Sequence, residues 1–341
     1  MKSLPSKIQD LAPKQAKLCL DIEKFGKQKC GTNFAASHLL VGVSGGIDST
    51  ALLIIATLLA RKSGGRVFCG HVDHGLRDES GQDRIFVEEL CQRMDVPFEV
   101  LKADVAGYAK QNSIGLEEAG RIIRYDFFKQ CLKKFNADFL LTAHHLGDLS
   151  EDIVMRLLRG TGWPALAGMD AYDPARKLLR PLISTKKEEL ENFLRSIGCP
   201  WREDKSNLSN AYTRNRVRNR ILPLLNEENP SLGVGLVRLK NQAEIDEDFW
   251  SGQIEDALKQ VESAKSDEIF LPCSILNNCH SALRLRIYKK ILDDLGPGHA
   301  LFDSILQLDQ AFLQRKSGLT FQFPGNKVVK LNKAGLLFKV N

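Results

Sequence analysis

A pair of glycines between an apolar run and a helix-like stretch constrains the fold of this chain more than any other feature. The apolar run covers residues 38–43 and passes into Ser44-Gly45-Gly46-Ile47-Asp48-Ser49-Thr50. Apolar side chains then recur at helical spacing over residues 49–61. Paired glycines let the backbone turn tightly and aim several N–H groups at one anion, and the beginning of a helix adds partial positive charge. The segment therefore predicts a strand, an anion-binding loop and a helix.

Strand-like and helix-like segments continue to alternate beyond this loop. Short apolar runs predict further strands at 66–72, 97–102 and 139–143. Helical periodicity covers residues 80–94, 116–134 and about 149–160. This order predicts an α/β fold, a Rossmann-like parallel sheet covered by helices on both faces, in which ligands bind at the carboxyl ends of the strands.

The pattern changes near Asn226, where a polar, proline-containing segment begins. Beyond it the sequence predicts helices at about 235–262, 281–295 and 299–315, followed by short strands at 319–323, 327–331 and 335–340. We therefore expect two domains. The first is a nucleotide-binding domain, residues 1–225, and the second is a smaller α+β domain, residues 226–341.

The composition is that of a folded soluble protein. Of the 341 residues, 43% are hydrophobic and 26% are charged, and the eight cysteines include no C-x-x-C pair. The spacing of a zinc ribbon or a cysteine-bound cluster is therefore missing, and we expect reduced thiols in a cytoplasmic protein. The most apolar stretch, residues 39–60, is interrupted by Gly45, Gly46 and Asp48, and residues 1–37 lack an apolar signal core. We therefore expect a buried helix there and no membrane segment.

Positive charge is concentrated in one part of the chain. The net charge is +6, but residues 1–175 are neutral, residues 226–341 carry −1 and residues 176–220 carry +7. Either a solvated helix face or a surface that binds a polyanion explains such a cluster. Four arginines alternate at its end: Arg214, Arg216, Arg218 and Arg220. They share one face if the segment is extended and spread around the axis if it is helical.

A second motif closes the strand expected at 66–72. It reads His71-Val72-Asp73-His74-Gly75-Leu76-Arg77, with Ser80 and Asp83 further on. Two histidines at this spacing are compatible with a metal site, but no third ligand lies nearby, so a turn that packs against a nucleotide is favoured. The glycine loop has neither a Walker A ending nor a dinucleotide-binding spacing, and a glycine-rich turn without function stays an alternative.

The glycine loop resembles the PP-loop of the ATP pyrophosphatases, which cleave ATP between the α and β phosphates and transfer AMP to an oxygen. Together with six further blocks in the same order, it resembles the tRNA(Ile)-lysidine synthetases over residues 38–225. The six blocks are His71–Arg77 with Ser80 and Asp83, Glu117–Tyr125, Thr142–His145 with Asp148 and Glu151, Leu157–Gly160 with Leu166–Met169, Arg180–Leu182, and Asp204–Asn207 with Tyr212–Arg218.

The chain departs from the family pattern at a few positions of these blocks. The family's first aspartate after the paired histidines is Gly147 here, its glutamine is Leu149 and its threonine is Asp152, and Gly120 replaces an alanine. The second aspartate and the glutamate remain, as Asp148 and Glu151. The change at Gly147 leaves open any role that needs both aspartates of the pair.

The resemblance implies a ligase that joins free L-lysine to C2 of the wobble cytidine of tRNA(Ile) with a CAU anticodon, after ATP has adenylated the cytidine in the presence of Mg²⁺. The implied ATP-binding residues are Ser44, Gly45, Gly46, Ile47, Asp48 and Ser49. The implied catalytic residues are Asp48, Arg121, Arg124, Asp148 and Glu151, and the implied metal ligands are Asp48 and Asp148. The basic segment is implied to bind tRNA through Arg202, Lys205, Arg214, Arg216 and Arg218, and residues 226–341 to contact tRNA as well.

Simpler roles for the same residues stay open. Arg121 and Arg124 lie at helical spacing from acidic residues 117 and 118 and are satisfied by pairing with them. Asp148 and Glu151 fall in a first helical turn, where carboxylates interact favourably with the helix dipole whatever their function.

Other functions are weighed against the ligase. A PP-loop tRNA thiolase is disfavoured by the missing cysteine pair, and a small-molecule synthetase leaves the basic segment without a purpose. A nucleotide-sensing RNA-binding protein is favoured only if the departures from the family motif abolish catalysis. The oligomeric state stays open, a homodimer included.

Overall fold

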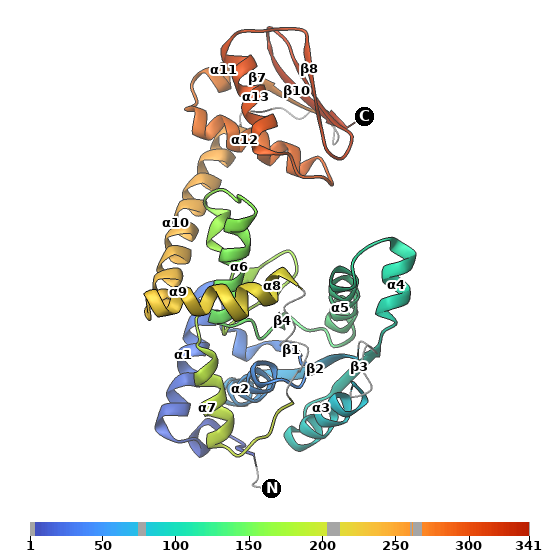
Figure 1. Ribbon diagram of the computed structural model, residues 1–341, viewed down its shortest axis with the longest axis vertical. Coiled ribbons are helices and arrows are strands. Elements are labelled where there is room, and N and C mark those ends of the chain that lie inside the picture. Colours follow the sequence, from blue (N-terminus) through green and yellow to red (C-terminus); the bar gives the residue numbers. More distant parts are fainter. Residues whose placement is uncertain (1–3, 74–79, 203–211, 260, 262–267, 341) are drawn as a thin grey trace. The chain divides into compact units, whose positions relative to one another are not determined.

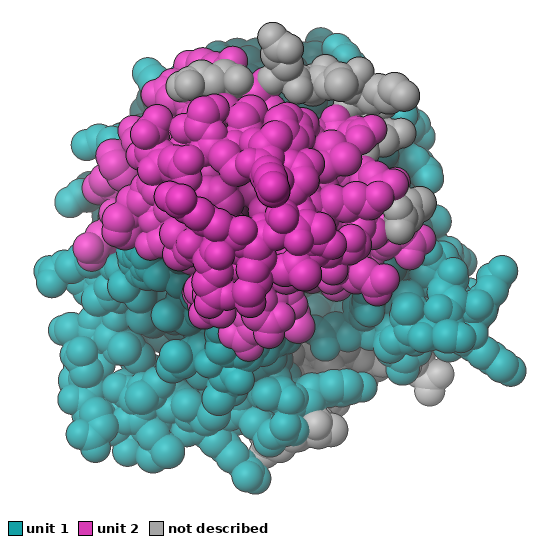
Figure 2. All heavy atoms as spheres, turned by 90° about the horizontal axis from the view of Figure 1, so that it is seen from above, with its two compact units in different colours: residues 1–240 teal, residues 241–341 magenta. Residues whose placement is uncertain are grey.

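The computed structural model describes residues 4–73, 80–202, 212–259, 261 and 268–340. It divides into two compact units, residues 1–240 and residues 241–341 (Figure 2). The division falls within a long helix, α10 (Leu232–Leu258). The domain boundary that we place near residue 225 stays a prediction from the sequence.

Unit 1 is built on a six-stranded sheet with the order β3-β2-β1-β4-β6-β5 (Figure 1). Its strands are β1 (His38–Gly42), β2 (Arg66–Asp73), β3 (Phe98–Lys102), β4 (Phe139–Leu141), β5 (Tyr172–Asp173) and β6 (Leu178–Leu179). All neighbouring strands run parallel except β5, which is antiparallel to β6. The predicted Rossmann-like sheet is confirmed. We did not predict β5 and β6, because strands of two residues show no periodicity.

Helices cover both faces of the sheet because its strands are apolar on both faces. Leu39 and Val41 of β1 pack in one core cluster with α1, α2 and α7, whereas Leu40 packs in another with Phe128 of α5. Successive side chains of a strand point to opposite faces, so both clusters depend on the same strand. The helices of this unit include α1 (Pro13–Cys30), α2 (Ile47–Ser63), α3 (Ser80–Met94), α4 (Val105–Asn112), α5 (Leu116–Lys134), α6 (Leu146–Leu158), α7 (Lys187–Ser196), α8 (Thr213–Arg216) and α9 (Leu222–Glu228).

Helix α2 accounts for the most apolar stretch of the sequence. Every residue from Ser49 to Ala60 is buried, because this helix packs against the sheet on one side and against α1 and α7 on the other. The predicted buried helix is therefore confirmed. Among the described residues, no helix combines the length and the apolar character that crossing a bilayer requires.

Parallel pairing brings three loops to one edge of the sheet. Val41 of β1 pairs with Leu141 of β4, and Leu141 pairs with Leu179 of β6. The chain leaves β1 into the glycine loop and α2, and it leaves β4 into the paired histidines and α6. The N-termini of α2 and α6 therefore meet beside the carboxyl ends of β1 and β4, where parallel sheets bind their ligands.

Unit 2 contains a four-stranded antiparallel sheet and helices packed on its core face. The sheet has the order β7-β10-β9-β8, with β7 (Glu268–Pro272), β8 (Leu319–Phe323), β9 (Lys327–Leu331) and β10 (Gly335–Val340). The helices are α11 (Cys273–Asn277), α12 (Ser281–Asp294) and α13 (Phe302–Leu313), together with the C-terminal part of α10. The three predicted strands are confirmed, and β7 is an additional strand that pairs with β10.

Candidate active site

The glycine loop joins β1 to α2 and leaves the N-terminus of α2 open. Gly45 has φ +92°, a conformation that is strained for a residue with a side chain, and no side chain in the described part of the protein caps the helix at Gly46. The Ser44 and Ser49 hydroxyls lie 3.1 Å apart, and the Ser49 hydroxyl donates to the Gly46 carbonyl at 3.2 Å. Thr50 is buried and donates its hydroxyl to the Gly45 carbonyl, so it stabilises the loop from inside. The uncapped N–H groups at the beginning of α2 are the groups that an anion would bind.

Asp48 lies in the first turn of α2 with one carboxylate oxygen unsatisfied. Its Oδ1 atom is buried and has no hydrogen-bond partner among the described residues, and its Oδ2 atom lies 3.7 Å from Nε2 of His145. Burial raises the pKa of Asp48, with opposing contributions from His145 and Lys187 and a further increase from Asp148. A buried carboxylate oxygen without a hydrogen bond is costly, and a bound cation would offset that cost.

His145 caps α6 and lies between two carboxylates. Its Nδ1 atom accepts a hydrogen bond from the Gly147 backbone N–H at 2.9 Å, and the backbone N–H of His145 donates to Asp148 Oδ2 at 3.0 Å. Its Nε2 atom is 3.6 Å from Asp148 Oδ2 and 3.7 Å from Asp48 Oδ2. Because Nδ1 accepts a hydrogen bond, the neutral ring is assigned its proton on Nε2, the atom that faces the two carboxylates.

Gly147, the main departure from the family pattern, makes room for the His145 ring. A Cβ atom at position 147 would lie 2.6 Å from Cε1 of His145 and 3.1 Å from Nδ1. Real Cβ contacts are longer, so an aspartate at this position requires a different placement of the imidazole. Glycine at 147 and histidine in this capping position therefore depend on each other.

Glu151 is the centre of an ion-pair cluster on α6. This carboxylate is only 2% exposed. It accepts from Arg214 Nε at 2.8 Å, and Arg218 donates to both of its oxygens, at 2.5 Å and 3.0 Å. Arg214 and Arg218 also lie 3.3 Å and 3.6 Å from Asp148 Oδ1. Two carboxylates and two guanidiniums thus satisfy each other beside the glycine loop.

The arginine segment is helical, which selects between the two arrangements left open by the sequence. Helix α8 continues into a π-helical turn, Val217–Ile221. Residues four apart share a face, so Arg214 and Arg218 both reach Glu151, whereas Arg216 donates to Thr213 Oγ1 and Arg220 is exposed. The alternating arginines therefore form two pairs with different surroundings.

Asp148 stays ionised because its partners outweigh its burial. Burial alone would raise the pKa of this carboxyl, but His145, His144, the His145 N–H and Arg214 lower it below its ordinary value. His144 behaves in the opposite way: burial, with help from nearby arginines, lowers its pKa to about 4. At neutral pH the site therefore contains an anionic Asp148 beside a neutral His144.

Arg121 and Arg124 lie on α5, and within the described residues neither forms a salt bridge with the acidic residues at 117 and 118, although Glu117 interacts electrostatically with Arg124. Among the described residues, no carboxylate forms an ion pair with either guanidinium. Arg121 packs over the Tyr125 ring at 5.5 Å, and Arg176 contacts the same ring at 5.5 Å. Desolvation lowers the pKa of Arg124, and the neighbouring cations Arg121 and Arg214 lower it further. This accumulation of positive charge is suited to an anionic ligand.

The remaining residues singled out by the sequence are distributed around this cluster. His71 is buried in β2 and its Nδ1 atom lies 2.8 Å from the Val43 carbonyl, whereas the turn expected to pack against a nucleotide after it stays a prediction. Arg202 lies against the glycine loop, bonded to Asp83. Lys205 and residues 74–79 lie outside the described residues. His145 lies in one of the family blocks, but no role was predicted for it, although a polar residue directly before a helix with an acidic residue three positions later is a capping signal.

Asp48 and Asp148 are the residues here that fit a magnesium ion. Mg²⁺ is usually held by one or two carboxylates together with phosphate oxygens and waters. The unsatisfied Oδ1 of Asp48 meets that requirement, and Asp148 lies on the other side of His145. In the described part of the chain, no group of three or more His, Cys, Asp or Glu side chains is arranged to hold a metal ion by itself.

Comparisons with known proteins agree with this geometry. Residues 18–225 match the family model described as a PP-loop domain. The chain is 40% identical to a tRNA(Ile)-lysidine synthase of Nitratidesulfovibrio vulgaris over 88% of its length and 91% of the relative. It is 30% identical to a tRNA(Ile)-lysidine synthase of Petrotoga mobilis over 92% of its length and 96% of the relative. A third, from Thermotoga sp., is 37% identical, and the match covers 53% of that relative.

A solved structure shares the fold at low sequence identity. The U34-tRNA thiolase NcsA of Methanococcus maripaludis superposes with a TM-score of 0.55 and 14% identity, covering 67% of this chain and 80% of the thiolase chain. At this identity the likeness concerns the fold alone, and it agrees with the parallel sheet of unit 1.

Replacing Gly147 by alanine tests the close approach to His145. We expect Gly147→Ala to lower the free energy of unfolding by about 1–3 kcal/mol, because the added Cβ displaces a buried ring. Gly162→Ala is the matched control, since no atom of the described residues lies within 4 Å of a Cβ at position 162. Urea denaturation of both variants measures the difference, and equal stabilities would contradict the steric role of Gly147.

Replacing Asp48 by asparagine tests the cost of its buried charge. The folded pKa of Asp48 is raised, so its ionisation opposes folding at neutral pH, and that penalty vanishes below about pH 4. We expect Asp48→Asn to raise the free energy of unfolding at pH 7 by about 0.5–2 kcal/mol, with a smaller gain in acid. Asp126→Asn, at an exposed position of α5, is the control. A variant that is less stable than the wild type at pH 7 would show that the carboxylate is satisfied.

Proposed function

The chain belongs to the tRNA(Ile)-lysidine synthase family of PP-loop enzymes, a family of ligases that form lysidine in tRNA, and we propose that it uses ATP and Mg²⁺ to join free L-lysine to C2 of the wobble cytidine of tRNA(Ile) with a CAU anticodon. The observation that carries this proposal is the convergence of the PP-loop, Asp48, Asp148 and Arg214 at one sheet edge. The cytoplasm is the proposed location, since that is where a bacterial-type tRNA-modifying enzyme meets its substrate.

The first step is adenylation of the cytidine. The C2 oxygen of cytidine is a poor leaving group, and transfer of AMP to that oxygen makes it a good one. The N–H groups at the beginning of α2 bind the departing diphosphate, and Ser44 and Ser49 line the same loop. Arg121 and Arg124 carry positive charge that no described carboxylate neutralises, and they suit the α-phosphate during transfer. When bound by Asp48 and Asp148, Mg²⁺ would neutralise negative charge on the phosphates.

The second step requires lysine to be held and deprotonated. Asp148 has a lowered pKa and stays ionised, so it is suited to binding the ε-ammonium group rather than to taking its proton. Glu151 is occupied on both oxygens by Arg214 and Arg218, so its role in the free enzyme is to hold those guanidiniums. The two carboxylates therefore serve different purposes, although the family motif presents them as a pair.

The cysteines weigh against the thiolase alternative. All eight are free thiols, and burial raises the pKa of Cys131 and of Cys199 to about 11. Thiols with raised pKa values are poor nucleophiles and poor metal ligands at neutral pH. Among the described residues, no group of three or more candidate ligands surrounds a cluster site. The ligase therefore accounts for the site better than sulfur transfer does.

Incubation of the protein with ATP, labelled lysine and tRNA(Ile) transcripts tests the function. We expect AMP release and lysine incorporation in equal amounts, and neither product with a transcript in which uridine replaces the wobble cytidine. Asp148→Asn is expected to raise KM for lysine at least about tenfold with a smaller change in KM for ATP, because it removes a charged partner of the ammonium group. Asp152→Asn, on the same helix and paired with Arg156, is the control. AMP release without lysine incorporation would overturn the proposal.

Two substitutions distinguish the proposed roles of the two arginine pairs in the basic segment. Arg216→Ala is expected to weaken tRNA binding and to reduce the slope of log K against log salt by about one, because it removes a phosphate contact. Arg214→Ala should impair turnover and leave that slope nearly unchanged, since Glu151 already neutralises this guanidinium. Filter binding over a range of salt concentrations measures both effects. If only the Arg214 variant changed the slope of log K against log salt, Arg214 and not Arg216 would be the residue that contacts a tRNA phosphate.

A further inference from the structure

Arg202 lies beside the PP-loop, although the sequence groups it with cations that bind tRNA. Its backbone N–H donates to the Gly45 carbonyl at 2.9 Å. Its Cγ atom lies 3.6 Å from the position that a Cβ on Gly45 would occupy, and its carbonyl lies 3.9 Å from the corresponding position on Gly46. Arg202 is therefore in direct contact with the loop that faces the phosphates.

The guanidinium of Arg202 is bonded to α3. Its Nε atom donates to Asp83 Oδ1 at 2.9 Å and its NH2 group donates to Gln82 Oε1 at 3.0 Å. On the same helix, Phe86 and Val87 each lie 3.5 Å from the Cβ position of Gly45. Helix α3 and Arg202 thus enclose the outer side of the loop together.

These contacts fix the direction of one carbonyl group. A loop that binds an anion through its N–H groups must keep its carbonyl oxygens pointing elsewhere. The Gly45 carbonyl accepts from the Arg202 N–H at 2.9 Å and from the Thr50 hydroxyl at 3.2 Å. Both bonds hold the peptide that follows Gly45, whose φ of +92° glycine adopts without strain. The two bonds therefore fix the orientation of the Gly45 carbonyl group.

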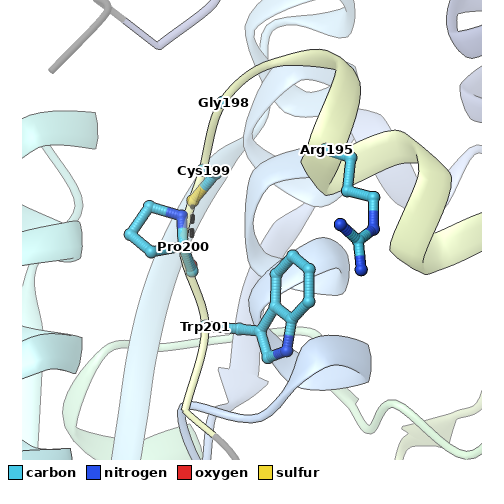
Figure 3. A pocket seen from close by; sticks show the side chains of 5 residues that line it. All are labelled: Arg195, Gly198, Cys199, Pro200 and Trp201. Carbon is cyan, nitrogen blue, oxygen red and sulfur yellow. Dashed lines mark hydrogen bonds between the residues drawn. The ribbon is translucent and has the colours of Figure 1, made fainter.

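The segment that leads to Arg202 is itself anchored on the core. It leaves α7 after the buried residues Phe193 and Leu194, and the Cys199 N–H donates to the Leu194 carbonyl at 3.0 Å. Arg195 packs over the Trp201 ring at 5.4 Å beside a cavity of about 590 Å³ (Figure 3). Residues 199–202 are thus hydrogen-bonded to α7 at one end and to the glycine loop at the other, so they connect the loop to the core.

We propose that Arg202 is a positioning residue of the PP-loop, which presets the loop for the phosphates of ATP and does not lend its charge to tRNA. Asp83 neutralises the guanidinium, so a tRNA phosphate would first have to break this ion pair. The inference rests on the proposed use of ATP by this loop.

Calorimetric titration with ATP and Mg²⁺ in the absence of lysine and tRNA tests this role. We expect Arg202→Ala to weaken ATP binding about tenfold and Arg202→Lys to weaken it less, since lysine keeps the ion pair with Asp83. The exchanged pair Asp83→Arg with Arg202→Asp should recover part of the affinity. Binding of tRNA and its salt dependence should match the wild type in all three variants.

Lys134→Ala is the matched control, because it also removes the cation of an ion pair in unit 1, with Glu99, at the C-terminal end of α5. It should bind ATP like the wild type. The inference would be overturned if Arg202→Ala bound ATP normally and lowered the slope of log K against log salt for tRNA binding by about one. Arg202 would then be a residue that contacts tRNA. If Arg202→Ala fails to fold, the ATP affinities of Arg202→Lys and of the exchanged pair test the inference instead. Failure of the wild type to bind ATP would instead contradict the proposed function.

Discussion

Parallel pairing between β1 and β4 is the constraint on which the candidate site depends. Each strand is followed at once by a helix, and the register Val41 to Leu141 brings the two helix N-termini to one edge of the sheet. Two positive helix ends beside each other repel, and acidic side chains in the first turns offset that repulsion. Asp48 and Asp148 occupy those turns. For Asp48 the cost of burial exceeds this benefit, and both carboxylates lie where a metal nucleotide would bind.

The carboxylates of the site differ in how completely their charges are paired. Glu151 and Asp148 accept from Arg214 and Arg218, and His145 lies between Asp148 and Asp48. A buried carboxylate with two guanidiniums is satisfied, whereas a buried carboxylate with one oxygen unpaired is not. Glu151 is therefore a structural anchor in the free protein, and Asp48 is the group with most to gain from a ligand.

The sequence predicted the parallel sheet because its strands are apolar and separated by strongly periodic helices. It also predicted which residues lie at the sheet edge, since a glycine loop and paired histidines each follow a strand. It could not predict that Arg214 and Arg218 face Glu151, because that depends on the helical state of a segment whose arginines alternate. The contact between Arg202 and Gly45 was equally invisible, since it joins parts of the chain far apart in sequence. Strands β5 and β6 were too short to leave a pattern.

The unsatisfied carboxylate oxygen of Asp48 has a consequence for the lifetime of the protein. A ligand that relieves an unfavourable charge in the folded state is bound by that state alone, so it shifts the folding equilibrium by mass action. The folded protein would then open less often with such a ligand bound at Asp48 than without it.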